Sequence, residues 1–220
     1  MVWQTYDYYF EPTAAYFAIK KASEPLHIQW NPATDEVEVV NYSAGTHKGL
    51  TAKVQILNMD ASVAWEKEAT VDSNEDTTNK CIKLAFPANL SKVHFIKMVL
   101  TENGKVISDN FYHRSLEENN YQDLRQLAKV ALQSTTTVDK NADGTWSAVS
   151  VIENKTSTPA LMIRLNVVGS KDGQQLLPVF YSDNYFSLLP GEKKEVRMSW
   201  KDEDTRGNEG KVLITGYNVE

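Results

Sequence analysis

The sequence predicts an all-β chain that consists of two immunoglobulin-like β-sandwich domains in tandem, preceded by a short helical segment. Apolar and polar residues alternate in many short runs, as expected of strands that have one buried face and one solvated face. Gly, Asn, Asp and Pro separate these runs at a spacing typical of hairpin turns. A helical pattern is limited to one stretch near the N-terminus and one in the middle of the chain.

The N-terminal segment stands out by its aromatic residues. A free N-terminus is usually polar and loosely held, whereas this one has the apolar content of an element that packs against a large partner. Pro12 marks the start of a helix predicted over residues 13–22, and Pro25 follows its end. We expect the segment to pack on the first sandwich or on a neighbouring chain, with self-association through residues 3–19. The aromatic residues of this segment are Trp3, Tyr6, Tyr8, Tyr9, Phe10, Tyr16 and Phe17.

The first sandwich is expected over residues 26–115. Ala52, Val54 and Ile56 illustrate its pattern, because they alternate with polar residues in a run that would form one strand. Asn103-Gly104 separates two such runs and is a strong signal for a two-residue hairpin turn. The strands are expected at residues 26–31, 36–41, 50–58, 62–71, 80–86, 93–101 and 105–113.

Residues 116–134 are predicted to form a linker with a short helix. The run at 117–120 is polar, and Leu124 and Leu127 then recur at helical spacing. The alternating pattern resumes over residues 135–220, with Asp-Gly and Pro-Gly turn signals between the runs, and predicts the second sandwich. Its strands are expected at residues 135–139, 146–154, 161–168, 174–181, 185–189, 193–200 and 211–219.

Composition excludes several classes of function. The chain has 220 residues, of which 41% are hydrophobic and 24% are charged, which is ordinary for a globular protein. The net charge of −6 argues against a general affinity for nucleic acid or for anionic membranes. No apolar run approaches the ~18 residues that a spanning helix needs, and no signal peptide is expected. The single Cys81 excludes a disulfide within the chain and predicts a buried structural thiol.

The sequence shows no constellation of catalytic or metal-binding residues. Residues 139–144 resemble the start of an EF-hand loop, but Ser150 stands where the loop would need its last glutamate, so a hairpin turn is favoured over a calcium site. The carboxylate clusters at 117–118 and 202–204 lie in predicted loops and suit a solvated surface. We therefore expect no catalytic residue, no metal and no cofactor. The histidines are too far apart in sequence for a zinc motif: His27, His47, His94 and His113.

Three stretches in the same order resemble the C-terminal third of glycoside hydrolase family 2 enzymes, above all exo-β-D-glucosaminidases and their β-mannosidase and β-galactosidase relatives. The first stretch is WQTYDY at 3–8 with AIKKASEPLHIQ at 18–29. The second is NFYH at 110–113 with YQDL at 121–124. The third is PVFYSDNYFSLLPGE at 178–192 with ITGYNV at 214–219.

The resemblance implies a fragment of a larger enzyme. Residues 1–25 would be the last loop and helix of a (β/α)₈ barrel, and the two sandwiches would follow that barrel. The acid/base and nucleophile carboxylates of a retaining β-glycosidase would lie upstream, so no catalytic residue is carried over and this chain alone is not expected to be an enzyme. Trp3 and Asp7 are implied to lie near the sugar site of the parent. A periplasmic or secreted bacterial location is implied in the same way.

Two main hypotheses follow. The first is a non-catalytic pair of sandwiches that supports the upstream barrel of the same protein and shapes its cleft. The alternative is a carbohydrate-binding module that binds an oligosaccharide through exposed aromatic rings, with Trp146 and Tyr185 as candidates. An adhesion or protein-interaction tandem is a third hypothesis, although it leaves the aromatic N-terminus unexplained. Nucleic acid and membrane are not expected as partners.

Overall fold

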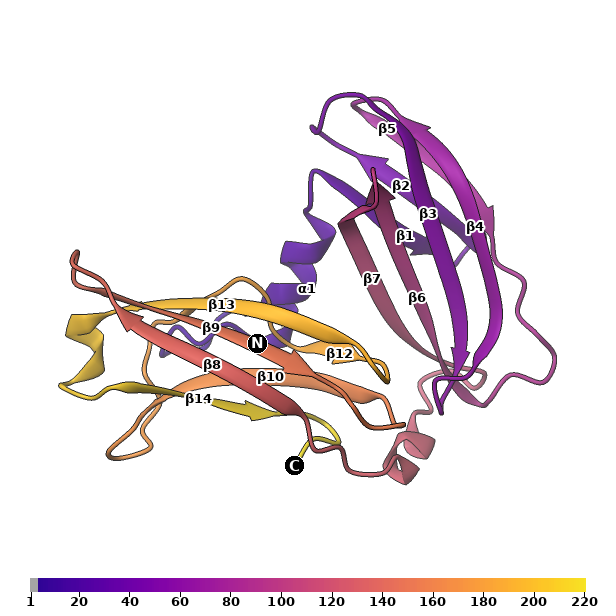
Figure 1. Cartoon of the computed structure of the whole chain (residues 1–220). Helices are drawn as coiled ribbons and strands as arrows, with labels where there is room; N and C mark the ends of the chain where they lie inside the picture. The colour runs from indigo at the N-terminus through magenta and orange to yellow at the C-terminus, as the bar shows by residue number, and fades with distance from the viewer. Residues whose placement is uncertain (1–3) are drawn as a thin grey trace. The chain divides into compact units, whose positions relative to one another are not determined.

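The computed structural model describes residues 4–220, which are built mainly from β-strands (Figure 1). The chain divides into two compact units. The first sandwich unit is Lys20–Gln126, and the second sandwich unit is Leu127–Glu220 together with the N-terminal segment through Ile19. The predicted all-β class with two sandwiches is thus confirmed. The division falls within α1 (Ala14–Ala22), the helix expected at residues 13–22.

The first sandwich unit contains two antiparallel sheets whose inner faces pack around Ile28, Val39 and Ile96. At the hairpin between its last two strands, Asn103 and Gly104 have φ values of 50° and 76°, as the sequence signal predicted. One sheet has the order β1 (Leu26–Asn31), β2 (Glu36–Asn41) and β5 (Thr77–Lys83). The other has the order β4 (Val63–Ser73), β3 (His47–Asn58), β6 (Val93–Glu102) and β7 (Lys105–Ser115). The short helix predicted in the linker is η1 (Gln122–Gln126).

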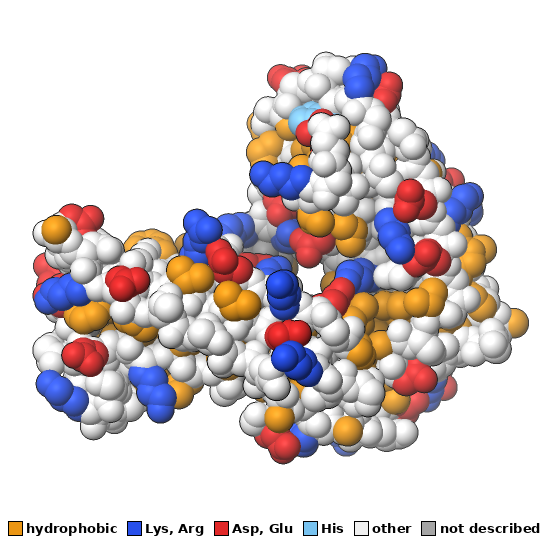
Figure 2. Space-filling model, in the orientation of Figure 1, with side chains coloured by type: hydrophobic (Ala, Val, Ile, Leu, Met, Phe, Trp, Pro, Cys, Tyr) orange, Lys and Arg blue, Asp and Glu red, His pale blue; other side chains and the backbone are white. Residues whose placement is uncertain are grey.

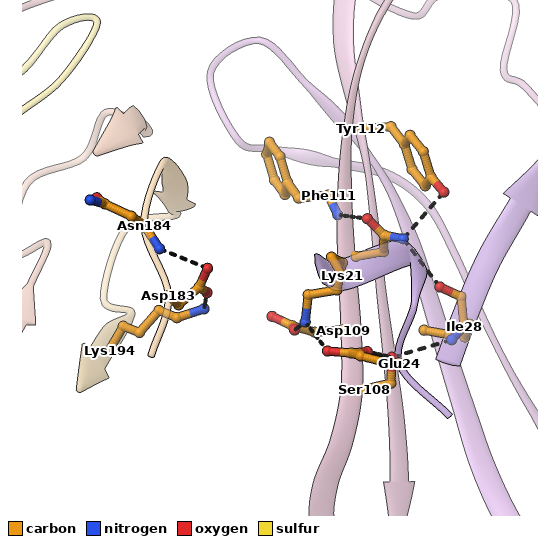
Figure 3. Close-up of polar contacts among 11 residues, drawn as sticks. Lys21, Glu24, Ile28, Ser108, Asp109, Phe111, Tyr112, Asp183, Asn184 and Lys194 are labelled. Atoms are coloured by element: carbon orange, nitrogen blue, oxygen red, sulfur yellow. Dashed lines mark hydrogen bonds and ion pairs between the residues drawn. The ribbon is translucent and has the colours of Figure 1, made fainter. Parts of the chain in front are cut away.

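A polar network joins the end of α1 to β7 in the first sandwich unit (Figure 3). The Lys21 Nζ atom lies 2.7 Å from Asp109 Oδ1 and 2.8 Å from Glu24 Oε1. Burial disfavours the charge on Lys21, but these two carboxylates outweigh burial and raise the pKa of the ammonium group. Ser108 Oγ donates to Glu24 Oε2 at 2.8 Å, so the network also includes a buried hydroxyl of β7.

The second sandwich unit also contains two antiparallel sheets, which enclose Ile152, Leu165 and Trp200. One sheet has the order β12 (Phe186–Leu188), β10 (Ala160–Gly169) and β14 (Gly210–Thr215). The other has the order β11 (Phe180–Tyr181), β13 (Lys193–Lys201), β9 (Thr145–Glu153) and β8 (Gln133–Lys140). A short 3₁₀ helix, η2 (Asp202–Thr205), lies between β13 and β14.

Three predicted strands of the second sandwich unit are shorter than expected, and one of them, predicted at 185–189, is β12 at Phe186–Leu188. The strand predicted at 174–181 is reduced to β11, because Pro178 has no N–H group to donate to a ladder. The strand predicted at 211–219 ends at Thr215. Beyond it, the side chain of Asn218 is buried and bonds to the backbone of other segments, so this part of the chain leaves the sheet.

The prediction that the N-terminal segment packs on the first sandwich is wrong. Phe17 is only 5% exposed and belongs to the core of the second sandwich unit. Its ring centroid lies 6.4 Å from that of Tyr181 and 6.0 Å from that of Tyr185. Tyr181 belongs to the short edge strand β11 and Tyr185 directly precedes β12, so the contact of Phe17 with these two rings removes apolar surface from water.

Charged side chains of both signs are interspersed on the face of the molecule in Figure 2, without a large field of one sign. Within residues 4–220, no helix is long and apolar enough to cross a membrane.

Candidate functional site

The N-terminal loop, residues 5–13, holds its own backbone in a tight turn. Thr13 N donates to Thr5 O at 3.0 Å, which closes the loop at its base. Asp7 Oδ1 accepts hydrogen bonds from Tyr9 N at 2.8 Å and Glu11 N at 2.9 Å, which fixes the tip. The side chain of Asp7 therefore stabilises this turn, and its expected place near a sugar site in the parent stays a prediction.

The tip of the N-terminal loop exposes three aromatic side chains to solvent. Tyr8 is 88% exposed, Tyr9 is 66% exposed and Phe10 is 67% exposed. Phe10 has a φ of 64°, a value that is uncommon for a residue with a side chain. Contiguous large aromatic side chains exposed in this way are unusual on the surface of a soluble monomer.

The N-terminal loop is attached to the second sandwich unit by charge as well as by Phe17. Glu11 forms an ion pair with Arg164 of β10, and the two side chains are 21% and 33% exposed. Burial raises the pKa values of the phenol groups of Tyr181 and Tyr185, which adjoin this pair. Both phenols are therefore neutral at physiological pH and act as packing groups.

Two hollows adjoin the N-terminal loop. The first, which we call the apolar groove, has a volume of about 400 Å³. Phe180 at this groove is 67% exposed. The second, which we call the mixed hollow, has a volume of about 800 Å³. Phe10 lines both the apolar groove and the mixed hollow. The other residues of the apolar groove include Tyr6, Tyr16, Pro178, Phe180 and Tyr181. The mixed hollow is lined by Tyr8, Tyr9, Phe10, Gln174, Gln175, Leu177 and Arg206.

The structure gives the predicted sugar-contact residues other partners. The Trp146 ring lies parallel to that of Trp200 with centroids 6.4 Å apart, and its Nε1 donates to Asp202 Oδ1 at 2.7 Å. Tyr185 is half-buried against Phe17. Trp3 lies outside the described residues. Among the described residues of the second sandwich unit, the most exposed aromatic rings are those of Tyr8, Tyr9, Phe10 and Phe180. The part of Trp146 and Tyr185 in sugar contact stays a prediction.

The residues of the second sandwich unit that line the two hollows opposite the N-terminal loop were not predicted from the sequence. Nothing in the local pattern around Phe180, Gln174, Gln175 and Arg206 distinguishes these residues from others on the surface. The aromatic run at residues 6–10 was the available signal, and the structure shows which loops of the second sandwich unit adjoin it.

The turn between β8 and β9 accounts for the polar residues that resemble a calcium loop. Asn141 N donates to Thr145 O at 2.8 Å, and Asp143 Oδ1 accepts from Thr145 N at 3.0 Å. Gly144 has a φ of 81°, as a tight hairpin requires. Within residues 4–220, no cluster of three or more His, Cys, Asp and Glu side chains is placed to hold a metal ion.

Cys81 and the carboxyl groups with shifted pKa values do not suit nucleophilic or acid catalysis. Cys81 of β5 is half-buried, and burial raises the pKa of its thiol to about 11, so it is not a thiolate at neutral pH. A glycosidase acid needs a carboxyl group with a raised pKa. In the described part of the chain, hydrogen bonds from neighbouring donors lower the pKa of each of these carboxyl groups: Asp60, Glu66, Asp72, Glu117, Asp143 and Asp202.

Comparison with known proteins connects this architecture to one family. The family described as the exo-beta-D-glucosaminidase Ig-fold domain matches residues 110–219. The exo-beta-D-glucosaminidase of Streptomyces avermitilis is 32% identical over 99% of this chain and 26% of its own length. That of Hypocrea jecorina is 30% identical over 99% of this chain and 26% of its own length.

Solved structures agree with the sequence comparison. The exo-chitosanase CsxA of Amycolatopsis orientalis superposes with a TM-score of 0.91 at 29% identity, over 99% of this chain and 28% of that protein. The matched part is the C-terminal region of CsxA. A β-D-mannosidase of Dictyoglomus thermophilum shares the fold, with a TM-score of 0.69 at 16% identity. The chain spans about a quarter of the length of the curated relatives. It therefore belongs to the exo-beta-D-glucosaminidase Ig-fold family, and it resembles the C-terminal region of glycoside hydrolase family 2 enzymes.

Proposed function

We propose that this chain is the non-catalytic C-terminal part of a retaining exo-β-D-glucosaminidase, and that it supports the catalytic part and one wall of its cleft. The observation that carries the proposal is the apolar groove beside an anchored N-terminal loop. Phe10 and Phe180 are each 67% exposed there, on backbone that is held by hydrogen bonds and by the Glu11–Arg164 pair. An exposed apolar surface of this kind is typical of a site that packs against another part of a protein.

The preceding part of the same polypeptide is the proposed occupant of the apolar groove. Relatives are about four times as long as this chain, and the matched part of CsxA is its C-terminal region. In such proteins the preceding part of the polypeptide would be covalently continuous with the segment that forms the N-terminal loop. Because a covalent connection keeps the two parts at high effective concentration, even a modest apolar surface suffices for stable docking.

The preceding part of the polypeptide and this chain would contribute differently to catalysis. Retaining hydrolysis needs a carboxylic acid and a nucleophilic carboxylate on either side of the scissile bond, about 5 Å apart. These groups would come from the preceding part. This chain would contribute rigid apolar contacts that hold the cleft closed to water on one side, which matters because small displacements of catalytic groups are costly.

A chimera tests this function. The C-terminal region of CsxA that matches this chain would be replaced by residues 1–220, and hydrolysis of p-nitrophenyl-β-D-glucosamine and the Tm would be measured. We expect a folded, active chimera that is more stable than CsxA lacking this region. Phe180→Ala and Phe10→Ala should lower its Tm and activity, whereas Tyr42→Ala should not, since Tyr42 is 72% exposed on the first sandwich unit. Unchanged stability and activity without the region would refute the proposal.

A further inference from the structure

We propose that His47 forms a pH-sensitive latch in the first sandwich unit. The latch holds the β2–β3 loop, residues 42–46, against the hairpin between β6 and β7 while the imidazole ring is protonated, and it releases the loop when the ring loses its proton. All the groups involved lie within Lys20–Gln126, so this inference does not depend on docking at the apolar groove.

Both nitrogen atoms of the His47 ring face hydrogen-bond acceptors. Nδ1 lies 2.8 Å from Oε1 of Glu102, the last residue of β6, and Nε2 lies 3.0 Å from the backbone oxygen of Ala44 in the β2–β3 loop. An ionised carboxylate and a carbonyl oxygen accept hydrogen bonds but cannot donate them. Because only the imidazolium form has an N–H group at both positions, this arrangement requires a protonated ring.

Loss of the proton breaks one of these two hydrogen bonds. A neutral ring has a single N–H group, and its other nitrogen then turns a lone pair toward an oxygen atom. The bond to Glu102 is the stronger of the two because its acceptor is ionised, so the neutral ring keeps it and loses the bond to Ala44. The β2–β3 loop is therefore the element that deprotonation releases.

The β2–β3 loop is attached mainly by polar contacts. Asn41 Nδ2 donates to Gly45 O at 2.7 Å, and Gly45 N donates to Glu75 Oε2 at 3.0 Å. Tyr42 is 72% exposed, whereas Ala44 is partly buried against the core of the first sandwich unit. Release of Ala44 would thus open one edge of this core, and segments with few buried apolar contacts are the ones that open locally.

The hydrogen bond with Glu102 raises the pKa of His47 and outweighs the opposing effect of burial. Lys48, the next residue of β3, does not offset this, since its ammonium group pairs with Asp72 of β4 at 3.2 Å. The other charged groups on the neighbouring elements are one cation and two carboxylates: Lys105 opposite Glu102 in the register of β6 and β7, and Glu75 and Asp76 in the turn before β5.

The direction of this shift sets the pH range in which the latch acts. Because the pKa is raised in the folded state, the latch contributes its full stability below the unfolded value of about 6.5. The contribution is lost as the pH rises through the raised folded value. The loop is therefore held under acidic conditions and released at higher pH.

Titration of the histidine rings by NMR tests the protonation of His47. The Hε1 signals of the chain would be followed from about pH 5 to about pH 9, a range that includes the ordinary histidine value. The His47 signal would be assigned by its loss in His47→Gln. We expect its midpoint above about 6.5, whereas His94 and His113, whose pKa values are lowered by burial, should titrate below that value.

Hydrogen exchange at the two ends of this range tests the loop. The rates would be expressed as protection factors, which remove the intrinsic dependence of exchange on pH. We expect protection of the loop to fall about fivefold above the His47 midpoint, the factor that corresponds to one ordinary hydrogen bond. Three amides report on the loop because each donates a hydrogen bond: Tyr42 N to Pro25 O at 2.7 Å, Ala44 N to Asn41 Oδ1 at 3.0 Å and Gly45 N to Glu75 Oε2 at 3.0 Å.

Two variants and one control assign the change to the latch. His47→Gln should give the same protection at both ends of the range, since an amide side chain does not titrate. Glu102→Gln should move the loss of protection to lower pH, because it removes the ionised partner of the ring, and it tests the latch even if His47→Gln is unstable. Lys48→Met is the matched control and should retain the fivefold loss, since Lys48 adjoins His47 but pairs with Asp72.

Three results would overturn the proposal. The first is a His47 midpoint at or below about 6.5. The second is equal protection of the three amides above and below the midpoint, which would show that the ring titrates without holding the loop. The third is a loss of protection that persists unchanged in His47→Gln. None of these results bears on the chimera, so failure of the latch and failure of the supporting role are distinguishable.

Discussion

The two sandwich units solve the same folding problem in different ways. In the first sandwich unit the edge strands contain 6 to 11 residues: β1, β5, β4 and β7. In the second sandwich unit the edge strands β11 and β12 contain two and three residues. There, buried asparagine side chains bond to the backbone where ladders are missing, and all three are less than 5% exposed: Asn154, Asn184 and Asn218.

The difference shows where a sandwich can carry function. Irregular backbone fixed by side chains leaves loops of defined shape at the surface, and such loops are the usual location of binding sites. Asn184 illustrates this, because its side chain both accepts from Leu165 N at 2.8 Å and donates to Leu165 O at 3.0 Å. Figure 3 shows it beside Asp183, whose carboxylate pairs with Lys194 at 2.5 Å. Both hollows lie in the second sandwich unit, beside its irregular segment 174–181.

Substitution of Phe17 should cause the largest loss of stability, and this loss should be confined to the second sandwich unit. Phe17→Ala is expected to destabilise the second sandwich unit by about 3–5 kcal/mol, because a buried aromatic ring is replaced by a cavity. Hydrogen exchange resolved by residue would measure the loss in each unit separately. Ile19→Ala is the matched control, since Ile19 is 55% exposed on the same helix. A loss centred on the first sandwich unit would contradict the packing described above.

Asn218→Ala should be the next largest change. It would leave Leu161 N, Ala128 O and Pro159 O without their present partners, at a cost of about 2–3 kcal/mol. Denaturant unfolding monitored by hydrogen exchange should show the loss in the second sandwich unit. Asn41→Ala provides the counterpart in the first sandwich unit, where Asn41 Nδ2 donates to Gly45 O at 2.7 Å. If both substitutions were harmless, side-chain bonding would not stabilise either unit.

Substitution of a hairpin glycine should reduce stability by the same amount in the two units, because the hairpins do not differ between them. Gly104 and Gly144 have φ values of 76° and 81°, and an added Cβ would meet no atom within 4 Å at either position. Substitution by Ala should cost about 1 kcal/mol at each site, from backbone strain alone. Thermal unfolding of both variants measures this. A much larger cost at Gly144 would indicate contacts at the β8–β9 turn that the structure does not show.

Acidification should cause the smallest loss of stability, and the part of this loss that comes from histidine should be confined to the first sandwich unit. All four histidines lie within Lys20–Gln126. Burial lowers the pKa values of His94 and His113, and Nε2 of His113 has no hydrogen-bond partner among residues 4–220. The stability they confer is fully present above the unfolded pKa of about 6.5 and is lost as the pH falls through their lowered folded pKa values.

His47 acts in the opposite direction and reduces the net effect. A hydrogen bond with Glu102 raises its pKa, so its contribution is fully present below about pH 6.5 and is lost as the pH rises through the raised value. Measured at about pH 7 and about pH 5, hydrogen exchange should show a small loss in the first sandwich unit and none attributable to histidine in the second. His113→Phe should reduce that loss, and a loss unaltered by this substitution would assign it to other groups.

Much of the fold follows from local pattern. The bounds of β1 and β2 agree with the sequence prediction, since period-2 alternation and flanking turns are properties of the residues themselves. The hairpin at Asn103-Gly104 follows from the backbone freedom of those two residues. The aromatic run at 6–10 likewise indicates an interaction surface by its composition alone.

Only the tertiary structure decided which surfaces those elements form. Phe17 packs in the core of the second sandwich unit against Tyr181 and Tyr185, which lie far along the chain, so no local window encodes this contact. Trp146 and Tyr185 stay candidate sugar contacts from the sequence, and only the structure shows that their rings pack against Trp200 and Phe17. The mixed hollow joins residues 8–10 to Gln174, Gln175 and Arg206. Sequence thus determined the strands and turns, whose causes are local, while the hollows depend on contacts between residues distant in the chain.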